Sequence, residues 1–196
     1  MPLFAGHSQP QVVRKLLLES MGLAYPLLQQ LLRFTLIHEL PDLNPKQQAE
    51  TIREHLASLH RMLLSEEASL SHPVRMAYVC LAQGLVLICT ESLSLFQLTS
   101  PGKGGPAAMH LLRVEQVLHE QYRLLYQALD EGDRTRVSAP HTFSSHIRQL
   151  LRDYTVFPPT YAMPYGALLR TSACTETMSR ILQHPTEQPF FPLTYV

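Results

Sequence analysis

The hydrophobic pattern is strongest in two long segments, residues 73–98 and 107–129. The first carries almost no charge between Arg75 and Glu91. A helix that is apolar on nearly every side must be buried on nearly every side. The glycine- and proline-rich residues 99–106 separate the two segments, so we predict a long antiparallel helical hairpin. This hairpin needs cover from the rest of the chain or from a second copy.

The segments before and after the hairpin also show helical spacing. Residues 11–39 predict a helix, which Pro26 should kink or split because proline lacks a backbone donor. Asn44 can cap a second helix that starts at Pro45 and has one narrow apolar stripe. A short helix should end near Tyr154. We therefore expect an all-α protein.

The C-terminal part of the chain is broken by prolines. Residues 155–171 should be an extended, apolar arm, because proline restrains itself and the residue before it. Residues 172–183 predict one more weak helix, and residues 185–196 a loose tail. The expected fold is thus a helical hairpin with flanking helices and a proline-rich C-terminal arm.

Composition narrows the class of protein. The chain has 196 residues, enough for one domain with its own core, and equal numbers of basic and acidic residues. A net charge of zero argues against a general nucleic-acid binder. Three cysteines are too few for a disulfide scaffold, and no secretory signal opens the sequence. The apolar run 76–90 is shorter than the ~20 residues of a membrane span, so a buried helix is favoured.

No constellation of reactive residues predicts an enzyme, a metal or a cofactor. Among ten histidines the best metal pair is Glu115 and His119, one helical turn apart, without a third ligand. The Gly102–Gly105 loop could hold an anion but lacks phosphate-loop spacing, so a plain turn is favoured. Residues 158–161, Pro-Pro-Thr-Tyr, match the PPxY ligand of WW domains. A purely structural role for that segment is the favoured alternative.

Several segments between about residues 35 and 171 resemble, in order and spacing, those of one known family. They are LIHELPDLNP ending at Pro45, LASLHRMLLSE at 56–66, SHPVRMAYVC at 71–80, RLLY at 123–126 and PPTYAMPYGALLRT at 158–171. Tyr154 and Tyr126 stand where that family has tryptophan. The family is the core (capsid) protein of hepatitis B virus and its relatives, which include the hepadnaviruses and the related nackednaviruses of fish.

The resemblance implies a homodimer. In that family a hairpin, here residues 72–129, pairs with a second copy to form a four-helix bundle that projects as a spike. Cys80 matches a cysteine that can bridge the two copies through a disulfide. The implied dimer-interface residues are Cys80, Leu81, Leu85, Leu87, Ile88, Leu111 and Leu118.

The resemblance also implies a shell. Dimers of that family join through a helix and arm, here residues 141–171, into an icosahedral nucleocapsid within the virion, assembled in the host cytoplasm or nucleus. Residues 1–171 would be the assembly domain, with 1–34 an added N-terminal helical region and 172–196 a C-terminal tail. The implied contacts between dimers are Pro45, Tyr126, Ile147, Leu151, Tyr154, Pro158, Pro159, Tyr161 and Pro164.

One departure from the family concerns nucleic acid. The family's arginine-rich tail binds RNA, whereas residues 172–196 contain a single arginine, Arg180. Viral RNA and polymerase would therefore be partners only through a basic tail that this sequence lacks.

Two other functions stay open. A helical adaptor with a WW ligand predicts an exposed 155–165 segment, and a carrier of an apolar ligand would use residues 74–98 as pocket lining.

Overall fold

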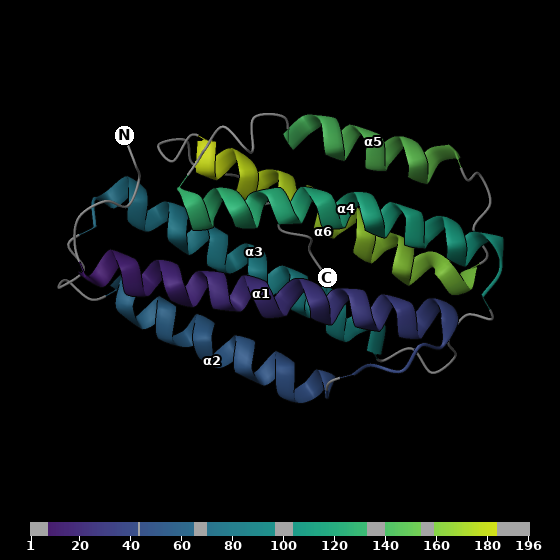
Figure 1. Cartoon of the computed structure of the whole chain (residues 1–196), viewed down its shortest axis with the longest axis horizontal. Coiled ribbons are helices and arrows are strands. Elements are labelled where there is room, and N and C mark those ends of the chain that lie inside the picture. The colour runs from purple at the N-terminus through teal and green to yellow at the C-terminus, as the bar shows by residue number, and fades with distance from the viewer. Residues whose placement is uncertain are drawn as a thin grey trace.

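The computed structural model describes residues 8–42, 44–64, 70–96, 104–132, 140–153 and 159–183. Within these ranges the chain is helical and contains no strand, which confirms the all-α prediction. Figure 1 shows the helices running roughly along one long axis. The elements are α1 (Ser8–Ile37), α2 (Pro45–Leu64), α3 (His72–Phe96), α4 (Pro106–Glu131), α5 (Pro140–Asp153), the 3-10 turn η2 (Pro159–Tyr161) and α6 (Ala162–Gln183).

Four of these helices form a bundle within the single chain. α1 packs against both α3 and α4, and α6 packs against the same two helices from the other side. α3 and α4 therefore occupy opposite corners of the bundle (Figure 1). α2 covers α1 and α3, while α5 covers α4 and α6. The apolar helix α3 thus finds its cover inside its own chain.

The predicted hairpin differs from this arrangement. α3 and α4 begin and end within two residues of the prediction, but they do not pack along one another. The connection 97–105 can span up to ~30 Å when extended. The diagonal of a bundle with ~10 Å between neighbouring axes is only ~14 Å. The connection is therefore long enough for two neighbours in sequence to sit at opposite corners.

α1 is a central element rather than an added one. Its assigned helix continues through Pro26, so the expected split is absent. The carbonyl that Pro26 leaves without a donor belongs to Gly22, an exposed residue that solvent can reach. Leu17, Met21 and Leu28 on this helix are fully buried. The region expected to be an N-terminal addition therefore supplies much of the core.

The prediction of an extended arm is wrong for residues 162–171, which belong to α6. Pro164 lies in the first turn of this helix, where backbone N–H groups have no helical partner, so the proline costs no hydrogen bond. The expected weak helix at 172–183 is the second half of α6, and the proposed domain boundary at 171 falls inside it. The expectations for residues 154–158 and 184–196 lie outside the described residues.

α6 approaches α3 closely. Gly84 on α3 has no side chain at this contact, where Cys174 donates to the Gly84 carbonyl at 3.4 Å. A β-carbon on Gly84 would lie 2.7 Å from Sδ of Met178. A bidentate ion pair joins the same two helices, with Arg170 Nε and Nη2 each 2.6 Å from an oxygen of Glu91. α6 is therefore part of the core and is held to α3 by packing and by charge.

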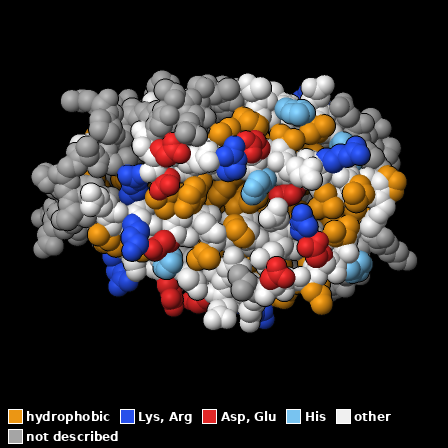
Figure 2. Space-filling model, viewed as in Figure 1, with side chains coloured by type: hydrophobic (Ala, Val, Ile, Leu, Met, Phe, Trp, Pro, Cys, Tyr) orange, Lys and Arg blue, Asp and Glu red, His pale blue; other side chains and the backbone are white. Residues whose placement is uncertain are grey.

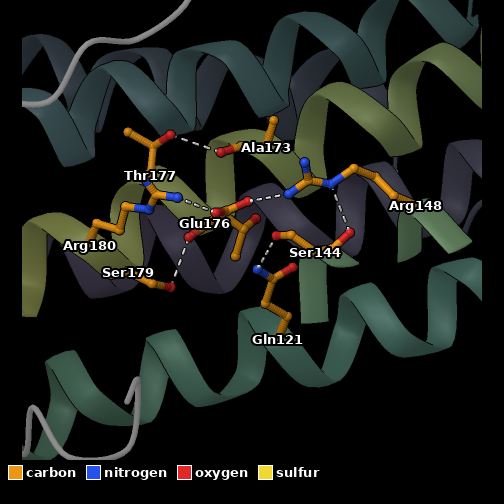
Figure 3. A network of polar contacts seen from close by, with 9 residues as sticks. Gln121, Ser144, Arg148, Ala173, Glu176, Thr177, Ser179 and Arg180 are labelled. Carbon is orange, nitrogen blue, oxygen red and sulfur yellow. Dashed lines mark hydrogen bonds and ion pairs between the residues drawn. The ribbon is translucent and has the colours of Figure 1, made fainter. Parts of the chain in front are cut away.

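α5 docks by a small apolar contact and a polar network (Figure 3). Its Ile147 and Leu151 are buried. Arg148 of α5 donates to Glu176 of α6 at 3.2 Å, and Arg180 donates to the same carboxylate at 2.6 Å. The Ser144 hydroxyl on α5 accepts a hydrogen bond from Gln121 of α4 at 3.3 Å. These contacts fix α5 across the α4–α6 edge of the bundle.

Candidate functional site

One stripe of α3 reaches solvent, and it is the most distinctive surface of the described chain. From Ala77 to Leu95 only Gln83, Val86 and Thr90 are exposed, and the other residues are buried or half-buried against α1, α2 and α6. Val86 in the middle of the stripe is 51 % exposed, a high value for a valine in the most apolar helix of the chain. We call this the α3 stripe, and its residues are Met76, Val79, Gln83, Val86, Thr90 and Leu93.

The spacing of the α3 stripe alternates three and four residues along its whole length. This is the heptad spacing by which one helix presents a straight seam to another helix. Apolar residues occupy four of its positions, and Gln83 and Thr90 lie seven residues apart on the same side. A seam of this mixed composition favours a reversible helix–helix contact and not a permanently buried core.

α2 turns the stripe into a groove of about 340 Å³. The small side chains of Ala57 on α2 and Ala82 on α3 leave room between the two helices. Among the lining residues Arg53 and His60 are the basic ones, and none is acidic. Arg53 is already paired with Glu50 at 3.2 Å. The lining residues are Ile52, Arg53, Leu56, Ala57, His60, Val79, Ala82, Gln83, Val86, Cys89, Thr90 and Leu93.

The face over α1 and α4 has a different character. Figure 2 shows basic and acidic side chains scattered there among apolar ones. Exposed ion pairs such as Lys15–Glu19 and Arg123–Glu120 belong to these two helices. Mixed surface charge of this kind is typical of a solvated face. The nearly uncharged groove beside α3 therefore stands apart from it.

The implied dimer-interface residues lie inside the chain. All of them except Leu87 are buried within the bundle, and Leu87 is half-buried. Since α3 and α4 occupy opposite corners, the residues drawn from these helices do not form one continuous surface. The implied residues that are buried here without a second copy are Cys80, Leu81, Leu85, Ile88, Leu111 and Leu118.

The three cysteines are buried free thiols. Burial raises the pKa of Cys80 and of Cys89, and it raises the pKa of Cys174 to about 12. Such thiols form little thiolate at neutral pH and react slowly. A disulfide between two copies through Cys80 would first require this side chain to leave the core.

The residues implied to join dimers are scattered in the structure. Ile147 and Leu151 face inward from α5, and Pro164 is buried in α6. Tyr126 lines a surface hollow with residues of α1, and Pro45 at the start of α2 is not part of that hollow. These residues therefore do not form one pocket. Pro159 is exposed, whereas Tyr154 and Pro158 lie outside the described residues.

Tyr161, the tyrosine of the PPxY match, is buried. It is 5 % exposed, and its hydroxyl donates to the Gly104 carbonyl at 2.7 Å. This contact ties the start of α6 to the loop that precedes α4. A WW domain needs the motif extended and accessible, so binding would require Tyr161 to leave its site.

Glu115 and His119, the best pair of metal-ligand types in the sequence, take part in a structural contact. Tyr25 of α1 donates to Glu115 Oε1 at 3.0 Å, and Gln29 donates to the same oxygen at 3.1 Å. The His119 ring lies 5.1 Å from the Tyr25 ring. Burial raises the pKa of Glu115, although the hydrogen bond from Tyr25 and the charges of His119 and Arg33 oppose this. Across the described ranges, no group of three or more His, Cys, Asp or Glu could hold a metal ion.

α3 is the one helix in the described ranges that is long and apolar enough to cross a membrane. However, 56 % of its most apolar window is buried within the bundle. The core helix of a globular protein passes the same test of length and composition. The packing of α1, α2 and α6 around α3 accounts for its hydrophobicity without a membrane.

Comparison of the chain with protein-family models, with curated proteins and with solved structures gave no match.

The α3 stripe was not predicted from the sequence, because residues 73–98 are apolar on nearly every side. The signal that could have identified it is the pair Gln83 and Thr90, since polar residues seven apart in an apolar helix share one face. They mark the side of α3 that faces solvent.

Proposed function

We propose that this protein is a non-enzymatic structural subunit that associates with further copies of itself and whose assembled form is a closed shell of the capsid type. The observation that supports self-association is the α3 stripe with its groove, an elongated surface with few charges. Its exposed apolar side chains, Met76 and Val86, lie beside the polar Gln83 and Thr90, and apolar residues with a polar surround are found at protein–protein contact sites.

The interior favours a structural role over catalysis. The buried carboxylates Glu91, Glu115 and Glu176 each accept hydrogen bonds that join two helices. A catalytic acid or base instead needs a cleft in which it can reach a substrate. Carboxylates used in this way hold a subunit rigid, which suits a part that is repeated in an assembly.

The capsid form of the proposal comes from the resemblance to hepatitis B virus core proteins. In this chain the subunit would be a compact bundle, since α3 and α4 do not form a projecting hairpin. Its shell would be a viral nucleocapsid, present in the virion and assembled in the host cytoplasm or nucleus. With equal numbers of acidic and basic residues in the chain, packaging of RNA would require a basic segment from elsewhere.

Electron microscopy and sedimentation of the purified protein, each at low and at high salt, test this function. Salt screens repulsion between like charges and strengthens apolar contacts, so assembly should increase with ionic strength. Hollow, roughly spherical particles of uniform size would support the capsid type. Dimers or small oligomers without shells would retain self-association and reject the shell. A monomer under every condition would reject both.

The adaptor interpretation receives less support from the geometry. It predicted an exposed 155–165 segment, whereas Tyr161 within that segment is buried against Gly104. A carrier of an apolar ligand is also less favoured, because side chains of α1 and α6 fill the space beside α3. The remaining groove of about 340 Å³ lies near the lower limit for small-molecule sites.

A further inference from the structure

The positions of the α3 stripe, although not its residue types, coincide when the helix is turned end for end. Met76 and Leu93 are equally far from the midpoint of the α3 stripe, and so are Val79 and Thr90. Gln83 and Val86 form the innermost pair, on either side of a point between Gly84 and Leu85. A two-fold axis through this point would place each stripe residue opposite a stripe residue of a second copy.

We propose that two copies of this chain associate through the α3 stripe, with the two α3 helices antiparallel and each seated in the α2–α3 groove of the other. This inference rests on the proposed self-association and adds its surface and its register. It uses the side of α3 opposite to the buried residues that the viral resemblance implied. The pairs across the axis are Met76 with Leu93, Val79 with Thr90, and Gln83 with Val86.

The size of the face fits a second copy. From Met76 to Phe96, α3 is ~30 Å long, and two helices side by side are ~20 Å wide, so the face covers ~600 Å². Two such faces hide ~1,200 Å², which is at the lower end of the range for specific protein–protein interfaces. The α2–α3 face is therefore large enough for a reversible dimer.

The charges also fit a second copy. A two-fold contact brings each group close to the same groups of the partner, so a strongly charged face would repel itself. No Asp, Glu, Lys or Arg lies in the α3 stripe. Arg53 at the groove already has Glu50 as its partner at 3.2 Å. A nearly neutral face therefore allows two identical surfaces to meet.

The polar members of the stripe set the register. Neighbouring layers of a helical seam are ~5 Å apart, so the two Gln83 side chains next to the axis can reach one another. A shift by one heptad would separate them and place apolar residues beyond the end of the partner helix. A polar residue inside a seam fixes alignment in this way at some cost in stability.

The first test is the Val86→Glu variant, measured by sedimentation equilibrium. Val86 is 51 % exposed, so the charge is tolerated in a single copy but would be buried twice, without a partner, in the dimer. We expect the dissociation constant to rise at least ~100-fold, since an unpaired buried charge costs several kcal/mol. Val12→Glu on α1, where the valine is 46 % exposed, is the matched control and should leave the constant unchanged.

The second test addresses the register, first by mixing two variants, Gln83→Lys and Val86→Glu. In the antiparallel arrangement, position 83 of one chain lies opposite position 86 of the other, so the new lysine meets the new glutamate. Differently tagged variants should therefore form a mixed dimer, while each variant alone stays weakly associated. A parallel seam would also favour the mixed dimer, because mixing separates the like charges of each variant, so a short bismaleimide linker decides the register. It should join Met76→Cys to Leu93→Cys in an antiparallel pair, but Met76→Cys to itself in a parallel one.

Each other outcome has a distinct meaning. Self-association that Val86→Glu leaves intact would overturn this surface and retain the proposed function. Loss of association with Val86→Glu but linkage of Met76→Cys to itself would overturn the antiparallel register. A wild-type monomer at all concentrations would reject the proposed function and this inference with it. A monomer that floats with phosphatidylcholine vesicles, and does so less with Val86→Glu, would assign the stripe to a lipid surface instead.

Discussion

Replacing Gly84 with alanine adds one methyl group at the contact between α3 and α6. The new β-carbon would lie 2.7 Å from Sδ and 2.9 Å from Cγ of Met178, and 3.1 Å from Sγ of Cys174. Carbon atoms in good contact are ~3.5–4.0 Å apart, so Met178 would have to move. Met178 is fully buried, and in a close-packed core its movement disturbs its neighbours.

Two opposing contributions determine the size of the effect. Alanine in a helix interior is favoured over glycine by about 1 kcal/mol. Overpacking a filled core costs about 1–3 kcal/mol. We therefore expect Gly84→Ala to lower the free energy of unfolding by ~0–2 kcal/mol, despite its better helix propensity.

Gly22→Ala is the matched control, because Gly22 lies inside α1 and a β-carbon there would meet no other part of the protein within 4 Å beyond its own helix backbone and chain neighbours. That substitution should raise the free energy of unfolding by about 0.5–1 kcal/mol. Urea unfolding followed by circular dichroism gives both values, provided that the slope of the transition is unchanged. In a Met178→Ala background the clash is largely removed, so Gly84→Ala should lose most of its penalty. Equal stabilisation by Gly22→Ala and Gly84→Ala would refute the close packing of α6 on α3.

Three further predictions concern buried groups. Because the pKa of Glu115 is raised in the folded state, this residue contributes fully to the free energy of unfolding below about pH 4.5, its ordinary pKa. That contribution is lost as the pH rises through the raised pKa. Glu115→Gln should therefore gain stability relative to wild type between acid and neutral pH in urea unfolding, and parallel pH profiles would contradict this. Cys174, with a pKa of about 12, should react with iodoacetamide at pH 8 only after denaturant is added, as followed by mass spectrometry. Tyr161→Phe loses the hydrogen bond to Gly104 and should cost about 0.5–1.5 kcal/mol, against about 3–5 kcal/mol for Tyr161→Ala. Equal losses for the two variants would show that the side chain is not packed in the core.

Helices could be predicted from the sequence wherever the signal is local. Asn44 accepts hydrogen bonds from the amides of Lys46 and Gln47, and α2 begins at Pro45 as its capping pattern indicated. α3 and α4 also lie within two residues of their expected bounds. Caps and periodicity act over a few residues, so the sequence contains them directly. The start of α6 was not predicted because the prolines of residues 155–171 indicated an extended segment, whereas Pro164 lies in the first turn of the helix, where proline is tolerated.

The arrangement of the helices could not be obtained in the same way. The hydrophobicity of α3 follows from its own residues, but the helices that bury it cannot be identified from those residues. Three helices of the same chain, α1, α2 and α6, share that task. The hairpin prediction assumed that neighbours in sequence are neighbours in space, and the connection 97–105 is long enough to break that rule.

The same reasoning explains why the candidate interface moved to the other side of α3. The resemblance to the viral core proteins implied Leu81 and Leu85 as interface residues, but the chain itself buries them. What remains for a second copy is the side that the chain leaves open, where Gln83 and Thr90 interrupt Met, Val and Leu. A seam of this mixed composition stabilises a dimer less than an all-apolar seam would, and the bundle already has its own core. The single copy should therefore stay folded when diluted, so that concentration determines when two copies meet.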